Sequence, residues 1–284
     1  MATAFSENLT AEQQSQVLQV FQQFQHPSLQ KDLIALNTLK KVEKGGDVLR
    51  IELQLPFAWN TGVEQVKQQL SDALLKATDS KEIKWVVNYQ IATLKRANNQ
   101  PAVKGVKNII AVTSGKGGVG KSSVSVNLAL ALQAQGARVG ILDADIYGPS
   151  VPHMLGAPHQ RPTSPDNQHI TPIKAHGLSA NSIGFLMDED NATIWRGPMA
   201  SSALSQLLNE TLWDSLDYLV IDMPPGTGDI QLTLSQQIPV TGAVVVTTPQ
   251  DIALLDAVKG VSMFERVSVP VLGIVENMSM HICS

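Results

Sequence analysis

The sequence contains a single cysteine, Cys283, and this excludes an internal disulfide framework. It has no apolar run of the roughly 18 residues that cross a bilayer, and no basic N-terminal region followed by an apolar core. It also lacks an excess of positive charge, since the net charge is -4 and the isoelectric point is about 5.8. No global basic field therefore points to nucleic acid. We expect a soluble, cytoplasmic protein with no nucleic-acid or membrane partner.

A glycine-rich segment between two apolar stretches is the most informative part of the chain. Ser114–Ser123 reads S-G-K-G-G-V-G-K-S-S and contains the phosphate-binding pattern G-x-x-x-x-G-K-S/T. The β-branched run 108–113 before it predicts a buried parallel strand, and the spacing in 124–134 after it predicts a helix. The N–H groups of such a loop and the N-terminus of the helix favour phosphate oxygens. The order strand, loop, helix disfavours the alternative, a glycine-rich turn that binds nothing.

The side chains of this loop have predicted roles toward a nucleoside triphosphate. Lys121 is expected to reach the β- and γ-phosphates, and the Ser122 hydroxyl is expected to bind Mg²⁺. The expected nucleotide-binding residues are Gly115, Lys116, Gly117, Gly118, Val119, Gly120, Lys121, Ser122 and Ser123.

Lys116 is a second lysine inside the loop, where an ordinary phosphate loop needs none. Its burial beside Lys121 without an anionic partner would be costly, and a bound triphosphate would supply that partner. With K-G-G-x-G-K-S/T at 116–122, the chain resembles the deviant Walker A ATPases of the MinD/ParA/nitrogenase-iron-protein group. The resemblance implies ATP as the nucleotide. It also implies a homodimer in which Lys116 acts in catalysis by contacting the nucleotide of the other subunit.

Residues 1–95 are predicted to form a separate small α+β domain in the order α-β-β-α-β. A capping box at Thr10 and Gln13 predicts a helix that ends near Phe24. Strands are expected at 36–42, 48–55 and 83–89, and a second helix at 62–77. This half resembles the MIP18-type domain of iron–sulfur assembly, but its loop 55–60 lacks the cysteine that this family often has. Partner docking and a purely structural role both stay open, and residues 96–107 are predicted to be a linker.

From residue 108 to 284, alternating strands and helices predict a doubly wound α/β domain with a mostly parallel sheet, the fold of a P-loop NTPase. The strand 138–142 leads into Asp143 and Asp145, and the strand 218–222 ends in Asp222 in a Walker B pattern. By the match to the ATPase family, Asp145 orients the attacking water as a catalytic residue. Asp143 and Asp222 would hold Mg²⁺ mainly through its water shell.

The acidic residues also have a structural alternative. Asp143 and Asp145 could be a helix-capping pair, since aspartate is common at turns from strand to helix. Asp229 follows the glycine-containing turn 224–228, and it could contact Mg²⁺ indirectly, contact a partner subunit, or cap the next helix.

Residues 151–195 are predicted to be the least regular part of this domain, because five prolines there break any helix. Four histidines in this stretch have spacings that match no zinc pattern, so surface positions explain them better than metal ligation: His153, His159, His169 and His176. The sequence Trp195-Arg-Gly-Pro-Met199 predicts the start of a helix through Leu208, and Arg196 could bind an anion or cap a carbonyl.

Two further strands, 242–247 and 269–275, are expected to continue the sheet, with a helix between them that begins at Pro249-Gln250-Asp251. The last strand leads into Asn277. The family match assigns this residue to reading the adenine base, because an amide can both donate to and accept from its polar edge. An ordinary turn asparagine is the alternative.

Several motifs together resemble one branch of the ATPase group, the Mrp/ApbC iron–sulfur carriers. They are Gly148-Pro-Ser150, Trp195–Met199, Pro224–Asp229, and Asn277-Met-Ser279 leading to Cys283. The resemblance implies an iron–sulfur cluster that bridges the dimer, with a cluster donor and apo-protein recipients as partners. Family members have C-x-x-C here, whereas this chain ends at Ser284, which indicates a truncated version of a longer protein. Cys283 is thus the expected cluster ligand, without the second cysteine that would complete four thiolates per dimer.

Two functional classes remain open at this stage. In the first, an ATP-hydrolysing dimer carries a cluster and transfers it to apo-proteins, with slow phosphoryl transfer to water. In the second, the same ATP switch positions or partitions a cargo, although no basic attachment helix or patch is present in the sequence. A small-molecule kinase is a distant third, because it would leave Lys116 unexplained.

Overall fold

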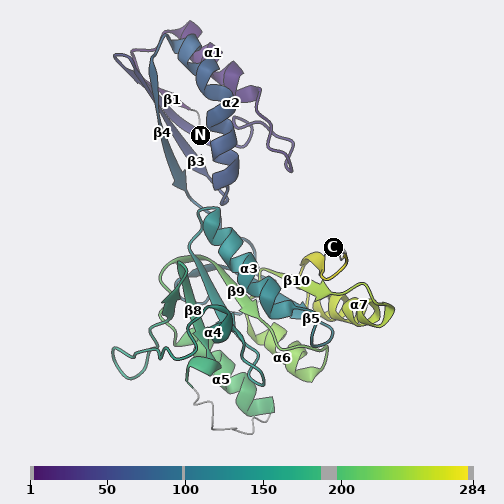
Figure 1. Ribbon diagram of the computed structural model, residues 1–284. Coiled ribbons are helices and arrows are strands. Elements are labelled where there is room, and N and C mark those ends of the chain that lie inside the picture. The colour runs from purple at the N-terminus through teal and green to yellow at the C-terminus, as the bar shows by residue number, and fades with distance from the viewer. Residues whose placement is uncertain (1–2, 98–99, 187–196, 281–284) are drawn as a thin grey trace, which may run out of the picture. The chain divides into compact units, whose positions relative to one another are not determined.

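In the computed structural model the chain folds as two units, and the structure describes residues 3–97, 100–186 and 197–280 (Figure 1). The first unit comprises residues up to Ala92 with Ala134–Gly136. The second comprises Thr93–Gln133 and the chain from Ala137 onwards.

The first unit is an α+β domain with two helices and a four-stranded sheet in the order β1-β2-β3-β4 (Figure 1). Its elements are β1 (Ala4–Phe5), α1 (Ala11–Gln22), β2 (Leu39–Gly45), β3 (Val48–Leu55), α2 (Asn60–Thr78) and β4 (Glu82–Tyr89). The predicted capping box is present, because Thr10 and Gln13 each accept a hydrogen bond from the backbone of the other. Val66, Leu70 and Leu74 form the buried stripe of α2 and join α1 and the sheet in one core.

The second unit contains a seven-stranded sheet in the order β11-β10-β5-β9-β6-β8-β7. Every neighbouring pair is parallel except β7 and β8, so the predicted α/β fold with a mostly parallel sheet is confirmed. Its elements are β5 (Val106–Ser114), α3 (Lys121–Ala134), β6 (Val139–Asp143), α4 (Val151–Met154), β7 (Ile173–Ala175), β8 (Leu178–Ser182), the 3-10 turn η1 (Ile183–Phe185), α5 (Gly197–Asn209), β9 (Leu216–Asp222), α6 (Asp229–Gln237), β10 (Gly242–Thr247), α7 (Asp251–Arg266) and β11 (Val271–Glu276).

The stretch after residue 150 is more regular than its prolines predict, and the expectation that it contains no helix is wrong. Pro152 lies in the first turn of α4, where a missing N–H breaks no helical hydrogen bond. His176 and Gly177 both have positive φ (49° and 79°) and form the two-residue turn between β7 and β8. The predicted helix start includes Trp195 and Arg196, which lie outside the described part of the chain. The described helix α5 begins at Gly197.

Asp217 at the start of β9 ties together three neighbouring parts of the sheet. Its buried carboxylate accepts hydrogen bonds from Lys107 Nζ at 2.8 Å and from the backbone and guanidinium N–H groups of Arg138 at 3.0–3.2 Å. Burial alone would raise the pKa of this carboxyl group. The hydrogen bonds from Arg138 and Lys107 outweigh it and hold the pKa below its ordinary value of 3.8.

We expect Asp217→Asn to lower the free energy of unfolding at neutral pH by about 1–2 kcal/mol, since both cations still reach solvent. The folded-state pKa lies below the unfolded one, so this contribution is complete above the unfolded pKa and is lost as the pH falls through the folded pKa. Urea unfolding should therefore show a difference in the free energy of unfolding between the unmodified protein and Asp217→Asn that is smaller near pH 3 than at neutral pH. Asp47→Asn, at an exposed ion pair with Lys81, is the control. A difference of the same size at both pH values would contradict the lowered pKa of Asp217.

Candidate functional site

The carboxyl ends of four neighbouring strands meet at one edge of the seven-stranded sheet. Asp143 at the end of β6 is in register with Asp222 of β9 on one side and with Ser182 of β8 on the other. β5 pairs with β9 and leads into the glycine-rich loop. Ligands of doubly wound sheets bind at this edge, so the structure brings the predicted loop and both acidic strand ends to one place.

The loop between β5 and α3 depends on its glycines. Gly118 and Gly120 have φ of +80° and +86°, a conformation that side chains disfavour. Gly115 lies against α7, and a methyl group there would come within 2.5 Å of the backbone of Asp256. The Ser114 hydroxyl donates to the Lys116 carbonyl at 2.8 Å. In the part of the chain that the structure describes, the Lys116 side chain has no hydrogen-bond or ion-pair partner.

Lys121 is the centre of a buried polar group beneath this loop. Its Nζ lies 2.8 Å from Asp222 Oδ1, 3.1 Å from Ser122 Oγ and 3.8 Å from Asp145 Oδ2. Ser125 Oγ also donates to Asp222 Oδ1, at 2.6 Å. Four of the predicted site residues, Lys121, Ser122, Asp145 and Asp222, are thus brought together.

Asp222 has one buried carboxylate oxygen without a hydrogen-bond partner in the described chain. Its side chain is fully buried, yet its Oδ2 atom has no hydrogen-bond partner within the described ranges. A buried carboxylate oxygen normally has a partner, such as an ordered water. With the nearby Ser122 hydroxyl it offers the oxygen ligands that Mg²⁺ and its water shell prefer, so these residues fit the ion.

The structure favours the capping alternative for Asp143. Its Oδ1 accepts from the backbone N–H of Asp145 at 3.1 Å, while Oδ2 accepts from the backbone N–H of Val151 at 3.1 Å and from Ser182 Oγ at 3.2 Å. One carboxylate therefore closes both ends of the loop 144–150. Complete burial, with the negative charge of Asp222 as the next cause, raises the pKa of Asp143 to about 7. These hydrogen bonds let Asp143 hold this loop, and its predicted contact with the Mg²⁺ water shell stays a prediction.

Asp145 is the acidic residue of this loop that stays available. Its half-buried carboxylate lies near Lys121, and its backbone is fixed by Asp143. Burial raises the pKa of this carboxyl group, and the positive charge of Lys121 opposes the increase. This position suits a group that accepts a hydrogen bond from a reacting water, and that role stays a prediction.

The end of β11 contacts the phosphate loop. Asn277 Nδ2 donates to the Val119 carbonyl at 2.9 Å, and the Asn277 backbone N–H donates to Thr247 at 2.8 Å. A methyl group on Gly120 would come within 2.3 Å of Asn277 Nδ2. Asn277 therefore lies directly against the loop, and its predicted role in reading the adenine base stays a prediction. Cys283 lies outside the described residues.

Gln231 of α6 is a site residue that the sequence analysis missed. Its buried Nε2 donates to the Pro224 carbonyl, and its Oε1 accepts from Thr113 Oγ1 at 3.3 Å. The Gly226 N–H donates to the Ser114 carbonyl at 2.9 Å. The loop after Asp222 is thus tied to the strand that carries the phosphate loop. The available signal was that Gln231 precedes the buried Leu234 and Ile238 at helical spacing, which predicts an inward side chain. Asp229 begins α6, and its side chain is not described.

The described residues offer neither a histidine metal site nor a membrane-spanning helix. His169 pairs with Asp166 at 2.6 Å, which lowers the pKa of Asp166 to about 2, and His176 Nε2 lies 3.2 Å from the Leu155 carbonyl. No group of three or more His, Cys, Asp or Glu side chains among residues 3–97, 100–186 and 197–280 could hold a metal ion. Within the same ranges no helix is long and apolar enough to cross a membrane.

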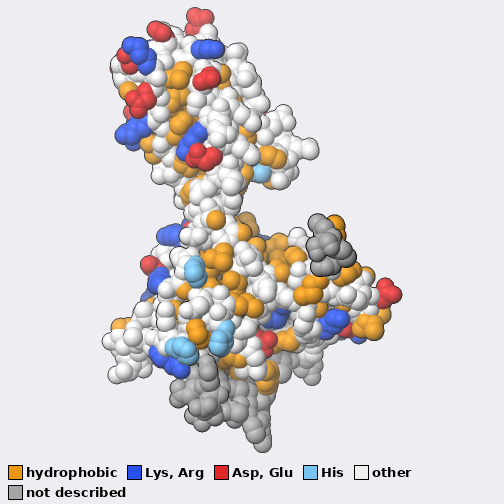
Figure 2. All heavy atoms as spheres, viewed as in Figure 1, with side chains coloured by type: hydrophobic (Ala, Val, Ile, Leu, Met, Phe, Trp, Pro, Cys, Tyr) orange, Lys and Arg blue, Asp and Glu red, His pale blue; other side chains and the backbone are white. Residues whose placement is uncertain are grey.

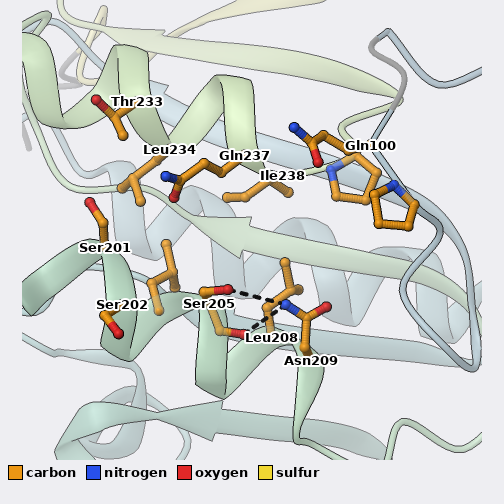
Figure 3. A pocket seen from close by; sticks show the side chains of 13 residues that line it. Gln100, Ser201, Ser202, Ser205, Leu208, Asn209, Thr233, Leu234, Gln237 and Ile238 are labelled. Carbon is orange, nitrogen blue, oxygen red and sulfur yellow. Dashed lines mark hydrogen bonds between the residues drawn. The ribbon is translucent and has the colours of Figure 1, made fainter. Parts of the chain in front are cut away.

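A cavity of about 790 Å³ lies between α5 and α6, away from the phosphate loop (Figure 3). Uncharged residues line it, among them Ser201, Ser205, Asn209, Thr233 and Gln237 (Figure 3). No residue of the loop 114–123 is among them. The cavity is therefore separate from the site built around Lys121.

Comparisons with known proteins agree with this geometry. Residues 105–284 match the family described as ParA: NUBPL iron-transfer P-loop NTPase. The chain is 91% identical over 284 residues to an iron-sulfur cluster carrier protein of Haemophilus influenzae, covering all of this chain and 77% of the relative. It is 67% identical over 261 residues to the protein of that name from Escherichia coli K12, covering 92% and 71%. A nucleotide-binding protein in complex with ADP from Archaeoglobus fulgidus superposes with a TM-score of 0.56 at 40% identity, covering 63% and 70%.

Proposed function

Because this chain belongs to the ParA/NUBPL family of iron-transfer P-loop NTPases, we propose that it is an ATP-binding and ATP-hydrolysing iron–sulfur cluster carrier that transfers clusters to apo-proteins. The family match confirms the resemblance predicted from the motifs. The names of the relatives from Haemophilus influenzae and Escherichia coli, iron-sulfur cluster carrier protein, support the cluster as cargo.

The observation that carries this proposal is the contact between Asn277 and the phosphate loop. Asn277 is held on Val119 and Gly120, and Cys283 follows six residues later. Six extended residues span about 20 Å at most, so chain length alone limits how far Cys283 can lie from Asn277. A change of the loop on nucleotide binding or hydrolysis would move the base of the cysteine-bearing segment. The site therefore links a nucleotide switch to a cluster ligand.

The chemistry we propose is phosphoryl transfer from ATP to water. Lys121 and the N–H groups of the loop bind phosphate oxygens, and Asp145 orients the water. Ser122 and Asp222 would hold Mg²⁺, directly and through water, and when bound the ion neutralises charge on the phosphates. Asn277 reads the adenine base. Asp143 and Gln231 act by holding the two loops on either side of the reacting phosphate.

We further propose that the working form is a homodimer. Lys116, which has no partner within the described chain, then meets the nucleotide of the other subunit, and a cluster bridges the two copies through Cys283 and further thiolates. A cluster donor and apo-protein recipients complete the partners. ATP and reduced thiols are both supplied in the cytoplasm, where we propose that the protein acts.

Anaerobic reconstitution with iron and sulfide tests the carrier function. The proteins to compare are this chain, a chimera that adds the part of the Haemophilus influenzae relative outside the match, and the chimera with Cys283→Ser. We expect a stable visible absorption band and bound iron in the chimera, and a several-fold lower iron content in its Cys283→Ser variant. Asp47→Asn in the chimera is a control that should keep its iron. Absence of iron from every protein, with ATP binding intact, would contradict the carrier function. The assignment as a nucleotide-hydrolysing protein would then still stand.

A further inference from the structure

The two carboxylate oxygens of Asp222 have different surroundings. Oδ1 lies 2.8 Å from Lys121 Nζ and accepts a hydrogen bond from Ser125 Oγ at 2.6 Å. Oδ2 has no hydrogen-bond partner within the described ranges. Figure 2 shows charged side chains of the first unit in red and blue on its surface, whereas Asp222 is fully buried in the second unit. A buried carboxylate depends on its few partners, so both donors to Oδ1 contribute to holding this side chain in place.

Helix α3 brings the Ser125 hydroxyl to this carboxylate. Ser125 is fully buried and lies about one helical turn after Lys121, on the same side of the helix. Its Oγ is 3.0 Å from the Lys121 carbonyl and 2.6 Å from Asp222 Oδ1. A serine hydroxyl has only one hydrogen to donate. The contact with the charged acceptor is the shorter and stronger one, so this hydrogen is directed to Asp222 and not to the helix backbone.

The two donors to Oδ1 differ in what nucleotide binding does to them. In the proposed function the Lys121 ammonium group binds phosphate oxygens, and these compete with Asp222 for it. Ser125 lies in the body of α3, beyond the loop 114–123, and its hydroxyl is already engaged by the carboxylate. Once phosphate oxygens occupy Lys121, Ser125 is the donor within the described chain that stays on Oδ1.

We propose that Ser125 is a positioning residue for the metal-binding carboxylate: it holds Oδ1 of Asp222 and leaves Oδ2 for Mg²⁺ and its water shell. This inference rests on the proposed function, because the ion is the one that accompanies ATP. It adds to the metal site a residue that lies outside the phosphate-binding pattern. Hydrogen bonds that hold metal-binding side chains typically contribute about 10–100-fold to metal affinity.

The test compares the affinity for a fluorescent ATP analogue in Mg²⁺ and in EDTA, measured by equilibrium titration. We expect Mg²⁺ to tighten binding to the unmodified chain. In Ser125→Ala the ratio of the two dissociation constants should fall by about tenfold or more, with the affinity in EDTA unchanged. Ser125→Cys has a similar volume but is a weak donor, so it should lose the ratio in the same way. Ser125→Thr keeps the hydroxyl and should retain most of the ratio.

Ser71→Ala is the matched control for the loss of a helical serine. Ser71 Oγ donates to the Lys67 carbonyl four residues earlier in α2, as Ser125 can toward Lys121, and no carboxylate is among its hydrogen-bond partners in the described chain. It should keep the ratio of the unmodified chain. Urea unfolding checks that each variant folds, and Ser125→Cys provides the test if Ser125→Ala folds poorly.

Three outcomes would overturn the inference. The first is an unchanged ratio in the alanine and cysteine variants of Ser125. The second is an equal loss of affinity in Mg²⁺ and in EDTA, which a purely structural role would produce. The third is an unmodified chain that binds the ATP analogue equally well with and without Mg²⁺. Absence of binding by the unmodified chain under both conditions would instead overturn the proposed function itself.

Discussion

Lys121→Ala is expected to weaken ATP binding by about 100-fold or more, because charge-assisted contacts to phosphate contribute about 1.5–3 kcal/mol each. The structure adds a second expected effect. Lys121 is the only cation within 4 Å of the fully buried Asp222 carboxylate in the described chain. Its removal leaves a buried charge with Ser125 alone, so the free energy of unfolding should fall by about 3 kcal/mol. Titration with a fluorescent ATP analogue and urea unfolding measure the two effects.

A double variant separates these two consequences of losing Lys121. Lys121→Met combined with Asp222→Asn removes both charges and keeps similar volumes, so most of the lost stability should return. ATP binding should stay weak, because the phosphate contacts are still absent. Lys259→Ala, at an exposed ion pair of α7, is a control that should keep both ATP affinity and stability. ATP affinity that is unchanged in Lys121→Ala would refute the assignment of the phosphate loop.

Asp145→Asn is expected to lower the rate of ATP hydrolysis by about 100-fold, the usual size of the effect of a positioned proton-accepting group. Asparagine has nearly the same shape and keeps the backbone N–H that donates to Asp143, so the loop 144–150 should hold its conformation. ATP affinity should therefore change by no more than a few-fold. Single-turnover hydrolysis at saturating ATP, together with equilibrium binding, measures the rate and the affinity separately.

The exposed Asp214 provides the control for Asp145 in the same unit of the chain. Asp214→Asn should leave hydrolysis and binding unchanged. Equal losses of affinity and rate in Asp145→Asn would mean that this residue shapes the nucleotide site and does not orient the water. Unchanged hydrolysis would leave the reaction without the proposed acceptor, since the carboxylate of Asp143 is already engaged by Asp145, Val151 and Ser182.

The hydrogen bonds of Asp143 restrict how the loop 144–150 can move. Because one carboxylate holds both ends of the loop 144–150, movement of that loop must break or rearrange hydrogen bonds at Asp143. Gln231 ties Pro224, in the loop after Asp222, to Thr113 of β5. Each loop beside the phosphate site is therefore fixed by one buried side chain. Such an arrangement favours discrete conformations over gradual motion.

Several features of this protein were determined by the sequence alone, because they depend on residues close together in the chain. The loop 114–123 carries its own glycines, lysines and hydroxyl groups. The capping box of Thr10 and Gln13 closes over three residues, and the apolar runs before Asp143 and Asp222 define their own strands. Local patterns of this kind predicted the α/β fold, the family and the group of Lys121, Ser122, Asp145 and Asp222.

Other features were decided only by the tertiary structure, because their partners are far apart in the chain. Asp143 accepts a hydrogen bond from Ser182, which lies 39 residues later in the chain. Asn277 donates a hydrogen bond to Val119, from which it is separated by 158 positions. The strands β7 and β8 form within a proline-rich stretch because His176 and Gly177 adopt positive φ and β6 offers a parallel edge. Gly115 meets α7 only once β10 lies beside β5. The sequence specified which groups gather at the phosphate loop, and long-range packing decided which of them hold the neighbouring loops.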